Sequence, residues 1–284
     1  MYRKSLLNTG FLCAIGALAL LCALPPVAQG AAETEFWEKS TESWFEPVGD
    51  SGTIFVHNPY GAIYARFGGY EAKAEIIGTS QRLEPEMPKL IVERNGSKED
   101  LYITVREEGS EGDSFRPRRD RVDLVLFVPI GRRVDLRTNE DTIAAKGVQG
   151  DLVAHSVSGD ISLRKMKGSV NAYSDRGRIQ VLLESAVTKL DQSFETVTGD
   201  IEMTVYEDAK LDVAAATSGM ISTDFSIKIE HRRFEEPGKH ASAVINGGGA
   251  KLTLRSKRGQ LSLLRQQKFF TKQEIEDSSE SGGS

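Results

Sequence analysis

The sequence has little cysteine, histidine or aromatic content. It is 284 residues long and contains 2 Cys, 4 His and 7% Phe, Trp and Tyr. Both cysteines, Cys13 and Cys22, lie near the start, so the chain beyond them has no disulfide and depends on burial and backbone hydrogen bonds for stability. The histidines are scattered and belong to no HExxH motif, so no zinc site is predicted. No metal ion or cofactor is expected.

An excess of positive charge is also missing. The chain has 36 Lys and Arg against 41 Asp and Glu, a formal net charge of -5. Binding to nucleic acid needs clustered cations to neutralise phosphates, so no nucleic-acid partner is predicted. With 39% hydrophobic residues, the composition also excludes a disordered polyelectrolyte and a multi-span membrane protein.

Only one long apolar run occurs, over residues 11–24. It follows Arg3 and Lys4 and precedes Pro25, Pro26 and a set of small residues, the pattern of a secretory signal peptide. The run is shorter than the roughly 20 residues that a spanning helix needs, although an uncleaved membrane anchor is the alternative. Residues 1–30 are therefore predicted to be a signal peptide, and the protein to be exported to the periplasm or cell surface without a transmembrane span after cleavage.

The rest of the chain divides by composition. Residues 31–52 are predicted to form an N-terminal lead-in, in which residues 36–45 are compatible with a short helix. Residues 53–265 consist of short alternating apolar runs separated by Gly, Asn, Asp and Ser, typical of β-strands. Residues 266–284 end in a polar, acidic, Gly/Ser-rich stretch that is predicted to be disordered.

Glycine is plentiful and regularly spaced. After each repeat glycine the second residue is apolar, as at Leu152, Ile161 and Val170, and the fourth is usually aliphatic or small. A nine-residue repeat fits a strand of about five residues plus a tight turn, in which glycine would supply a positive φ. The repeat glycines, the first four of them nine residues apart, are Gly150, Gly159, Gly168, Gly177, Gly199, Gly219 and Gly259.

This spacing predicts an all-β fold. Two repeats make one coil of about 20 residues, and stacked coils bury the inward aliphatic positions in a continuous ladder. We therefore expect a right-handed β-solenoid-like stack of short strands with glycine turns. A β-sandwich built of hairpins is the alternative, because strands at 8–12-residue intervals also fit that class.

The stretch Val122–Leu163 carries a family resemblance. Its Val128-Pro129-Ile130-Gly131 strand end and its Ser158-Gly159-Asp160-Ile161 phrase, with the related phrase at 198–201, resemble the DUF4097 family of exported bacterial β-strand-repeat proteins. The resemblance covers residues 44–264, most of the chain beyond the signal. It implies a right-handed β-solenoid-like fold, an adhesin label and no established catalytic residues.

Sequence motifs that suggest catalysis or metal binding lack their context. Asp follows the repeat glycine at three of seven positions, too few for a calcium-binding repeat, so these aspartates are predicted to accept backbone N–H bonds. The phrases at 49–52, near His57, and at 112–115 resemble nucleophile motifs but have no ordered partners. No catalytic residues are predicted. A carbohydrate-active enzyme would need a pair of carboxylates on one outward face, and nothing in the sequence pairs the candidates. These candidates are Asp160, Asp175, Asp200 and Glu202.

Two charged loops are the predicted recognition surface. One holds the local basic concentration of the chain, which neighbouring acids such as Glu107 and Asp120 balance in the alternative interpretation. The other is a charged insert at 230–240, alternatively a solvated loop without function. The predicted recognition residues are Arg116, Arg118, Arg119, Arg121, His231, Arg232, Arg233 and His240.

Together these features predict an exported, non-catalytic protein of the cell envelope or surface. Its expected role is that of an adhesin-like binding or scaffold module, whose partner is a protein or polysaccharide of the envelope. Two alternatives remain open: an accessory partner of a membrane-embedded envelope sensor or anti-sigma system, and a carbohydrate-active β-helix enzyme.

Overall fold

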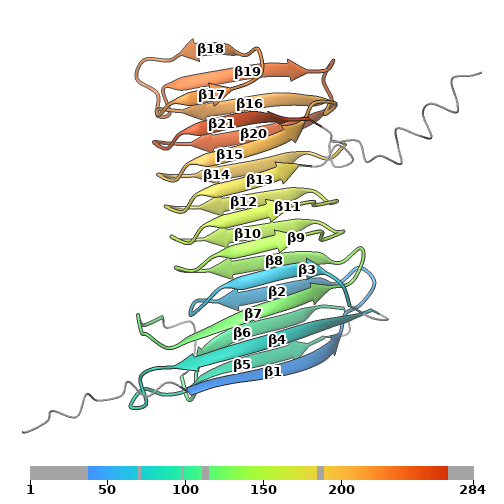
Figure 1. Cartoon of the computed structure of the whole chain (residues 1–284), viewed down its shortest axis with the longest axis vertical. Helices are drawn as coiled ribbons and strands as arrows, with labels where there is room; N and C mark the ends of the chain where they lie inside the picture. The colour runs from blue at the N-terminus through green and yellow to red at the C-terminus, as the bar shows by residue number, and fades with distance from the viewer. Residues whose placement is uncertain (1–37, 70–71, 98, 111–114, 184–188, 268–284) are drawn as a thin grey trace, which may run out of the picture. The chain divides into compact units, whose positions relative to one another are not determined.

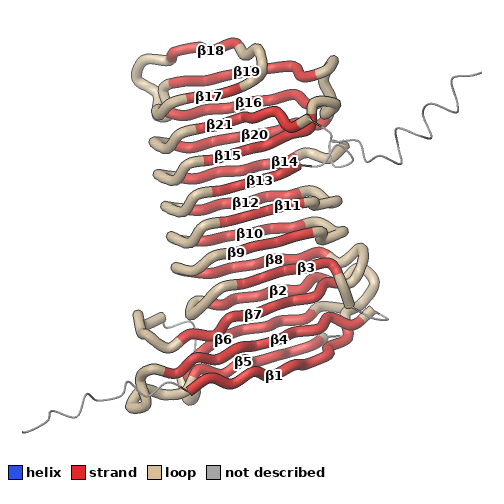
Figure 2. The backbone as a smooth tube through the Cα atoms, viewed as in Figure 1, coloured by secondary structure: helices blue, strands red, loops and turns tan. Residues whose placement is uncertain are grey.

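The computed structural model describes residues 38–69, 72–97, 99–110, 115–183 and 189–267 (Figure 1). The predicted signal peptide and residues 268–284 of the predicted tail lie outside these residues. Every regular element in the described residues is a β-strand, and the loops lie at the two edges of the stack (Figure 2). No helix long and apolar enough to cross a membrane occurs among them.

The strands form two sheets. The order across the ten-stranded sheet is β1 (Glu38–Pro47), β4 (Lys73–Arg82), β7 (Arg121–Val128), β3 (Ile63–Phe67), β9 (Ile143–Lys146), β11 (Ile161–Arg164), β13 (Ile179–Leu183), β15 (Ile201–Tyr206), β21 (Leu261–Gln266) and β17 (Ile221–Thr223). The order across the eleven-stranded sheet is β18 (Lys228–His231), β19 (Lys239–Ile245), β16 (Leu211–Thr217), β20 (Ala250–Ser256), β14 (Gln192–Thr196), β12 (Val170–Ser174), β10 (Leu152–Ser156), β8 (Arg133–Thr138), β2 (Thr53–Asn58), β6 (Leu101–Glu107) and β5 (Leu90–Gly96).

The register of the central strands confirms the stacked-coil prediction. Leu152 pairs in parallel with Val170, and Val170 pairs in parallel with Gln192, so the neighbour of each strand lies one full coil further along the chain. Parallel neighbours of this kind cannot be joined by tight hairpins, because the chain must cross to the other sheet between them. The central strands are therefore coils of a solenoid-like stack, not the hairpins of a sandwich.

Antiparallel strands close both ends of the stack. At one end β4 pairs antiparallel with β7, β5 with β6, and β1 with β4. At the other end β19 pairs antiparallel with β16, and β18 with β19. The short helix considered for residues 36–45 is wrong for its described part, since residues 38–47 form β1. Polar side chains at alternate positions of β1, such as Glu42, line a cleft between β1, β4 and β5 at this end of the stack. Inward charges of this kind protect an open sheet edge against pairing with another chain.

The chain does not stack its coils in sequence order. β20 lies between β14 and β16, and β21 lies between β15 and β17. The last coil therefore enters a gap between two earlier ones. The opposite end shows the reverse arrangement, because the early strand β2 lies between two later strands, β6 and β8.

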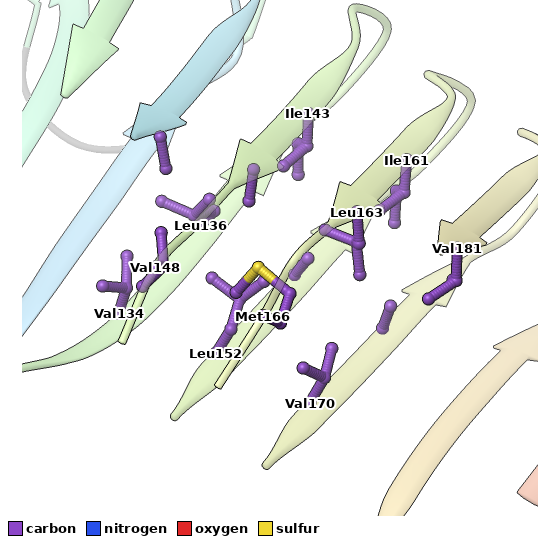
Figure 3. Packing of buried hydrophobic residues seen from close by; sticks show 14 of the residues in the cluster. Val134, Leu136, Ile143, Val148, Leu152, Ile161, Leu163, Met166, Val170 and Val181 are labelled. Atoms are coloured by element: carbon purple, nitrogen blue, oxygen red, sulfur yellow. The ribbon is translucent and has the colours of Figure 1, made fainter. Parts of the chain in front are cut away.

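The hydrophobic core follows the inward positions of the repeat. Val134, Leu152 and Val170 are adjacent in register, as are Ile143, Ile161 and Ile179, and all are at most 1% exposed (Figure 3). Burial of each such side chain contributes about 1.5–3 kcal/mol. The apolar positions of successive repeats therefore stack on one another and form continuous apolar ladders from coil to coil.

Glycine is required at the repeat positions for a reason other than the predicted one. The seven show no positive φ, so the expectation that they supply a left-handed turn conformation is wrong. They are close-approach positions instead: a Cβ atom on Gly177 would lie 2.1 Å from the carbonyl oxygen of Gly159, and one on Gly199 would lie 2.0 Å from that of Gly177. Only glycine lets successive backbones stack this closely.

Polar side chains satisfy the same turns. The buried hydroxyl of Ser174 accepts the Gly177 N–H at 2.8 Å, and that of Ser256 accepts the Gly259 N–H at 2.8 Å. The predicted role of the aspartates is confirmed, with the donors on the next coil. Asp160 accepts the Arg178 N–H at 2.8 Å, and the equivalent bonds of Asp151 and Asp200 connect other coils.

Candidate functional site

The segment from Arg116 to Arg121 is built mainly as an internal ion-pair network. The side chain of Arg118 is fully buried and is bonded to Glu107 and to Asp120, whose side chains are each 3% exposed. Arg116 also bonds Glu107, and Arg121 bonds Asp123 at 2.6 Å. Arg118 is therefore withdrawn from any partner, while Arg116 and Arg119 remain exposed.

The insert at 230–240 is part of a β-hairpin. His231 ends β18 and His240 lies in β19, with Arg232 and Arg233 in the exposed connection between them. Glu235 lies 3.3 Å from both the Arg232 guanidinium and the His240 imidazole. Much of the charge of the insert is thus neutralised within the hairpin.

The two predicted loops do not form one surface. Arg116–Arg121 leads into β7, near the end of the stack closed by β1 and β5. The hairpin of β18 and β19 closes the other end (Figure 1). Several coils separate them, so a ligand that touched both would have to extend along the stack.

The other motif residues that the structure describes are engaged structurally, whereas residues 112–114 of the phrase at 112–115 lie outside the described residues. Asp50 bonds Arg132 at 2.8 Å and Ser51 donates to Glu99 at 3.4 Å, so neither is part of a triad with His57. Asp160 and Asp200 hold backbone N–H groups, as described above. No group of three or more potential metal ligands occurs within the described residues.

A feature that the sequence did not reveal crosses the exposed face of the eleven-stranded sheet. One outward side chain from each of six neighbouring strands falls in register, and we call this set the outer row. Its members, in spatial order, are His57, Arg137, His155, Tyr173, Glu195 and Arg255. With strands about 4.8 Å apart, the outer row is about 24 Å long.

Aromatic pairs border and join the outer row. The rings of Phe55 and Tyr102 stack at 4.8 Å with an interplanar angle of 8°. The rings of His155 and Tyr173 lie 5.1 Å apart at 27°. Tyr102 is 44% exposed, so these rings offer flat apolar surface to a partner.

Charged groups beside the rings are held in fixed positions. Asp135 accepts two hydrogen bonds from Arg137, at 2.9 and 3.0 Å, which orients the guanidinium along the sheet. The Tyr173 hydroxyl donates to Asp175 at 2.5 Å, and this bond raises the pKa of Tyr173, so the phenol stays protonated as a donor. The Arg137 guanidinium is therefore oriented before any ligand arrives, and the Tyr173 oxygen, whose one proton is given to Asp175, is left as an acceptor.

Two shallow hollows follow the outer row. Each has a volume of about 440 Å³, and they lie side by side because Arg137 and His155 line both. The first extends to Phe55 and Tyr102, and the second extends to Glu195. A signal for this site does exist in the sequence, because His155 and Tyr173 follow Gly150 and Gly168 at the same offset, one coil apart.

The chain is similar in fold to solved structures that carry adhesion names. One is described as a putative cell adhesion protein from Clostridium sporogenes, with 11% identity, coverage of 81% of this chain and 100% of that chain, and a TM-score of 0.47. Another is described as a putative adhesin from Bacteroides fragilis, with 9% identity, coverage of 81% and 97%, and a TM-score of 0.28. No protein-family model and no curated protein sequence matches the chain, so membership of the DUF4097 family stays a prediction.

Proposed function

We propose that this protein is an exported, non-catalytic, adhesin-like binding module that holds a polysaccharide of the cell envelope along the outer row. The observation that carries the proposal is the continuous outer row itself, with aromatic rings and oriented polar groups on a rigid sheet. Binding surfaces are enriched in Tyr, Trp and Arg, and aromatic rings give contact area at low entropic cost.

The shape of the site favours an extended ligand. The hollows are shallow and run across the strands. The described residues of the outer row do not line a deep pocket that could enclose a single small molecule. An extended sugar chain can lay its apolar ring faces on Phe55, Tyr102 and Tyr173 while its hydroxyl groups bond Arg137 and Glu195. A protein partner from the envelope is the competing outcome of the test below.

Removing the stacked pair tests this proposal. The purified protein is applied to an array of envelope polysaccharides, and the double variant Phe55→Ala/Tyr102→Ala is expected to bind the recognised polymer about 10- to 100-fold more weakly. Phe45→Ala is the matched control, because Phe45 is an exposed aromatic residue (61%) on β1, away from the outer row. Equal binding by both variants, or silence across the array, would contradict the proposal.

The proposal that the protein is not an enzyme is tested separately, by looking for cleavage of the bound polysaccharide. Asp175 is engaged by Tyr173, and Glu202 lies 3.4 Å from the side-chain nitrogen of Gln180, so neither faces a second carboxylate in a described contact. We expect no new reducing ends when the bound polysaccharide is incubated with the protein. Turnover that Asp175→Asn or Glu202→Gln abolishes would instead establish the enzyme alternative.

A further inference from the structure

A second ordered row lies on the outward face of the ten-stranded sheet. Arg66 pairs in register with Lys146, and Lys146 pairs with Arg164. The three side chains, which we call the cation row, stand near the carboxyl ends of β3, β9 and β11, about 4.8 Å apart from strand to strand. Lys146 and Arg164 are exposed and Arg66 is half-buried.

The cation row has no carboxylate partner among the residues that the structure describes. One Arg66 nitrogen donates to the carbonyl oxygens of Ala65 and Ala144, at 2.9 and 2.8 Å, which leaves its other donors available. The flanking positions in register are apolar, Phe127 on one side and Leu182 on the other. Like charges on directly neighbouring strands destabilise a sheet. At Arg66 the two carbonyl bonds and the Tyr64 ring, whose centroid lies 5.7 Å from the guanidinium carbon, offset part of this cost, whereas Lys146 and Arg164 have no carboxylate among the described residues to offset it.

A hollow lined by polar side chains, one of them the carboxylate of Glu202, adjoins the row. It has a volume of about 250 Å³, begins at Arg164 and is lined by Gln180, Glu202, Thr204 and Gln266. Amide and hydroxyl groups of this kind bond sugar hydroxyls. Glu202 places a negative charge in the hollow, so the part of a ligand that lies there is expected to present hydroxyl groups, and its acidic groups are expected to face the cation row.

We propose that the cation row and this hollow form a second binding site, whose ligand is a linear acidic polysaccharide with carboxylate groups on its sugars. Three cations spaced by one strand match acidic groups repeated along a chain, and the hollow matches the hydroxyls of the adjoining sugars. The net charge of -5 opposes long-range attraction of a dense polyanion, so local charge complementarity decides the binding. The site faces away from the outer row and does not depend on the function proposed for it.

The test uses polygalacturonate as the probe, with dextran as the neutral polymer. Polyphosphate and phosphatidylglycerol vesicles represent the other anionic occupants. The wild-type protein is expected to bind polygalacturonate, with an affinity that falls as salt is added, and not to bind dextran. Lys146→Gln/Arg164→Gln is expected to weaken this binding at least about tenfold, by roughly 1.4 kcal/mol or more.

The matched control is Lys210→Gln/Lys257→Gln, which removes the same charge from exposed residues outside the row and should change binding less than about twofold. The thermal midpoint of Lys146→Gln/Arg164→Gln should equal or exceed that of the wild type, because a like-charge contact is removed. Phe55→Ala/Tyr102→Ala should bind polygalacturonate normally. Equal loss in both glutamine variants, stronger binding to polyphosphate or vesicles, or no polygalacturonate binding would overturn the proposal.

Discussion

Replacing Gly177 with alanine is expected to destabilise the fold strongly. The new Cβ atom would lie 2.1 Å from the carbonyl oxygen of Gly159 and 2.5 Å from its carbonyl carbon, both backbone atoms of the preceding coil. Those atoms are fixed by the parallel ladder, so they cannot move aside as a flexible side chain would. The expected loss is about 3 kcal/mol or more of the free energy of unfolding, measured by urea denaturation followed by circular dichroism.

Gly96→Ala provides the control for this prediction. A Cβ atom on Gly96, at the end of β5, would meet nothing within 4 Å, and its φ is not positive. That variant should be neutral or slightly more stable, because alanine lowers the entropy of the unfolded chain. If Gly177→Ala and Gly96→Ala denature at the same urea concentration, the glycines are not close-approach positions.

Removing the buried guanidinium of Arg118 is the second large perturbation. Arg118→Ala would leave the buried carboxylate of Asp120 without its cation and would leave Glu107 paired with Arg116 alone, at 3% exposure for each carboxylate. Breaking a buried ion pair in this way costs about 3–5 kcal/mol. Arg133→Ala is the control, because Arg133 is 64% exposed and lies 4.0 Å from Asp151, and it should cost no more than about 0.5 kcal/mol.

The Arg118 network also predicts a pH dependence. Burial acts to raise the pKa of Asp120, but hydrogen bonds from the Leu83 N–H, from Arg118 and from the Glu84 N–H outweigh it and hold that pKa below its ordinary value. A depressed carboxyl pKa stabilises the folded state above the unfolded-state value and loses that effect as the pH falls through the folded-state value. The stability gap between wild type and Arg118→Ala should therefore narrow below about pH 4. A gap that is constant from neutral to acidic pH would contradict this account.

The repeat predicted the coils well and their order badly. The inward ladder was predictable from the regular spacing of Leu152, Ile161 and Val170, because a fixed period places equivalent side chains at equivalent positions of successive coils. The phrases at Gly219 and Gly259 are alike in sequence, so nothing in them indicates that the later coil lies between the earlier one and Gly199. Stacking geometry decides it: Gly259 contacts the carbonyl of Gly199, and Gly219 contacts that of Gly259.

The binding faces were less predictable than the core. Inward positions share one chemistry, so their period is visible, whereas the outer row mixes His, Arg, Tyr and Glu and shows its alignment only once strands are paired. The cation row joins Arg66 to Lys146 from distant parts of the chain, because β3 and β9 become neighbours only after the chain has built β4 to β8. For Arg118 the sequence left two interpretations open, recognition of a partner and balance by neighbouring acids, and the ion pairs with Glu107 and Asp120 agree with the second.

β20 and β21 come last in the sequence, but they lie between strands that precede them, so the last coil joins two earlier coils. Residues 250–266 fill the space between two coils that precede them in the chain, and Leu252 finds its partner Gln192 on a strand completed several strands earlier. A chain that is synthesised from its N-terminus therefore cannot complete its stack until this last segment has been made. Before then, β14 and β16 each lack the strand that they share as a neighbour, so the backbone groups on those edges stay unpaired until β20 is in place.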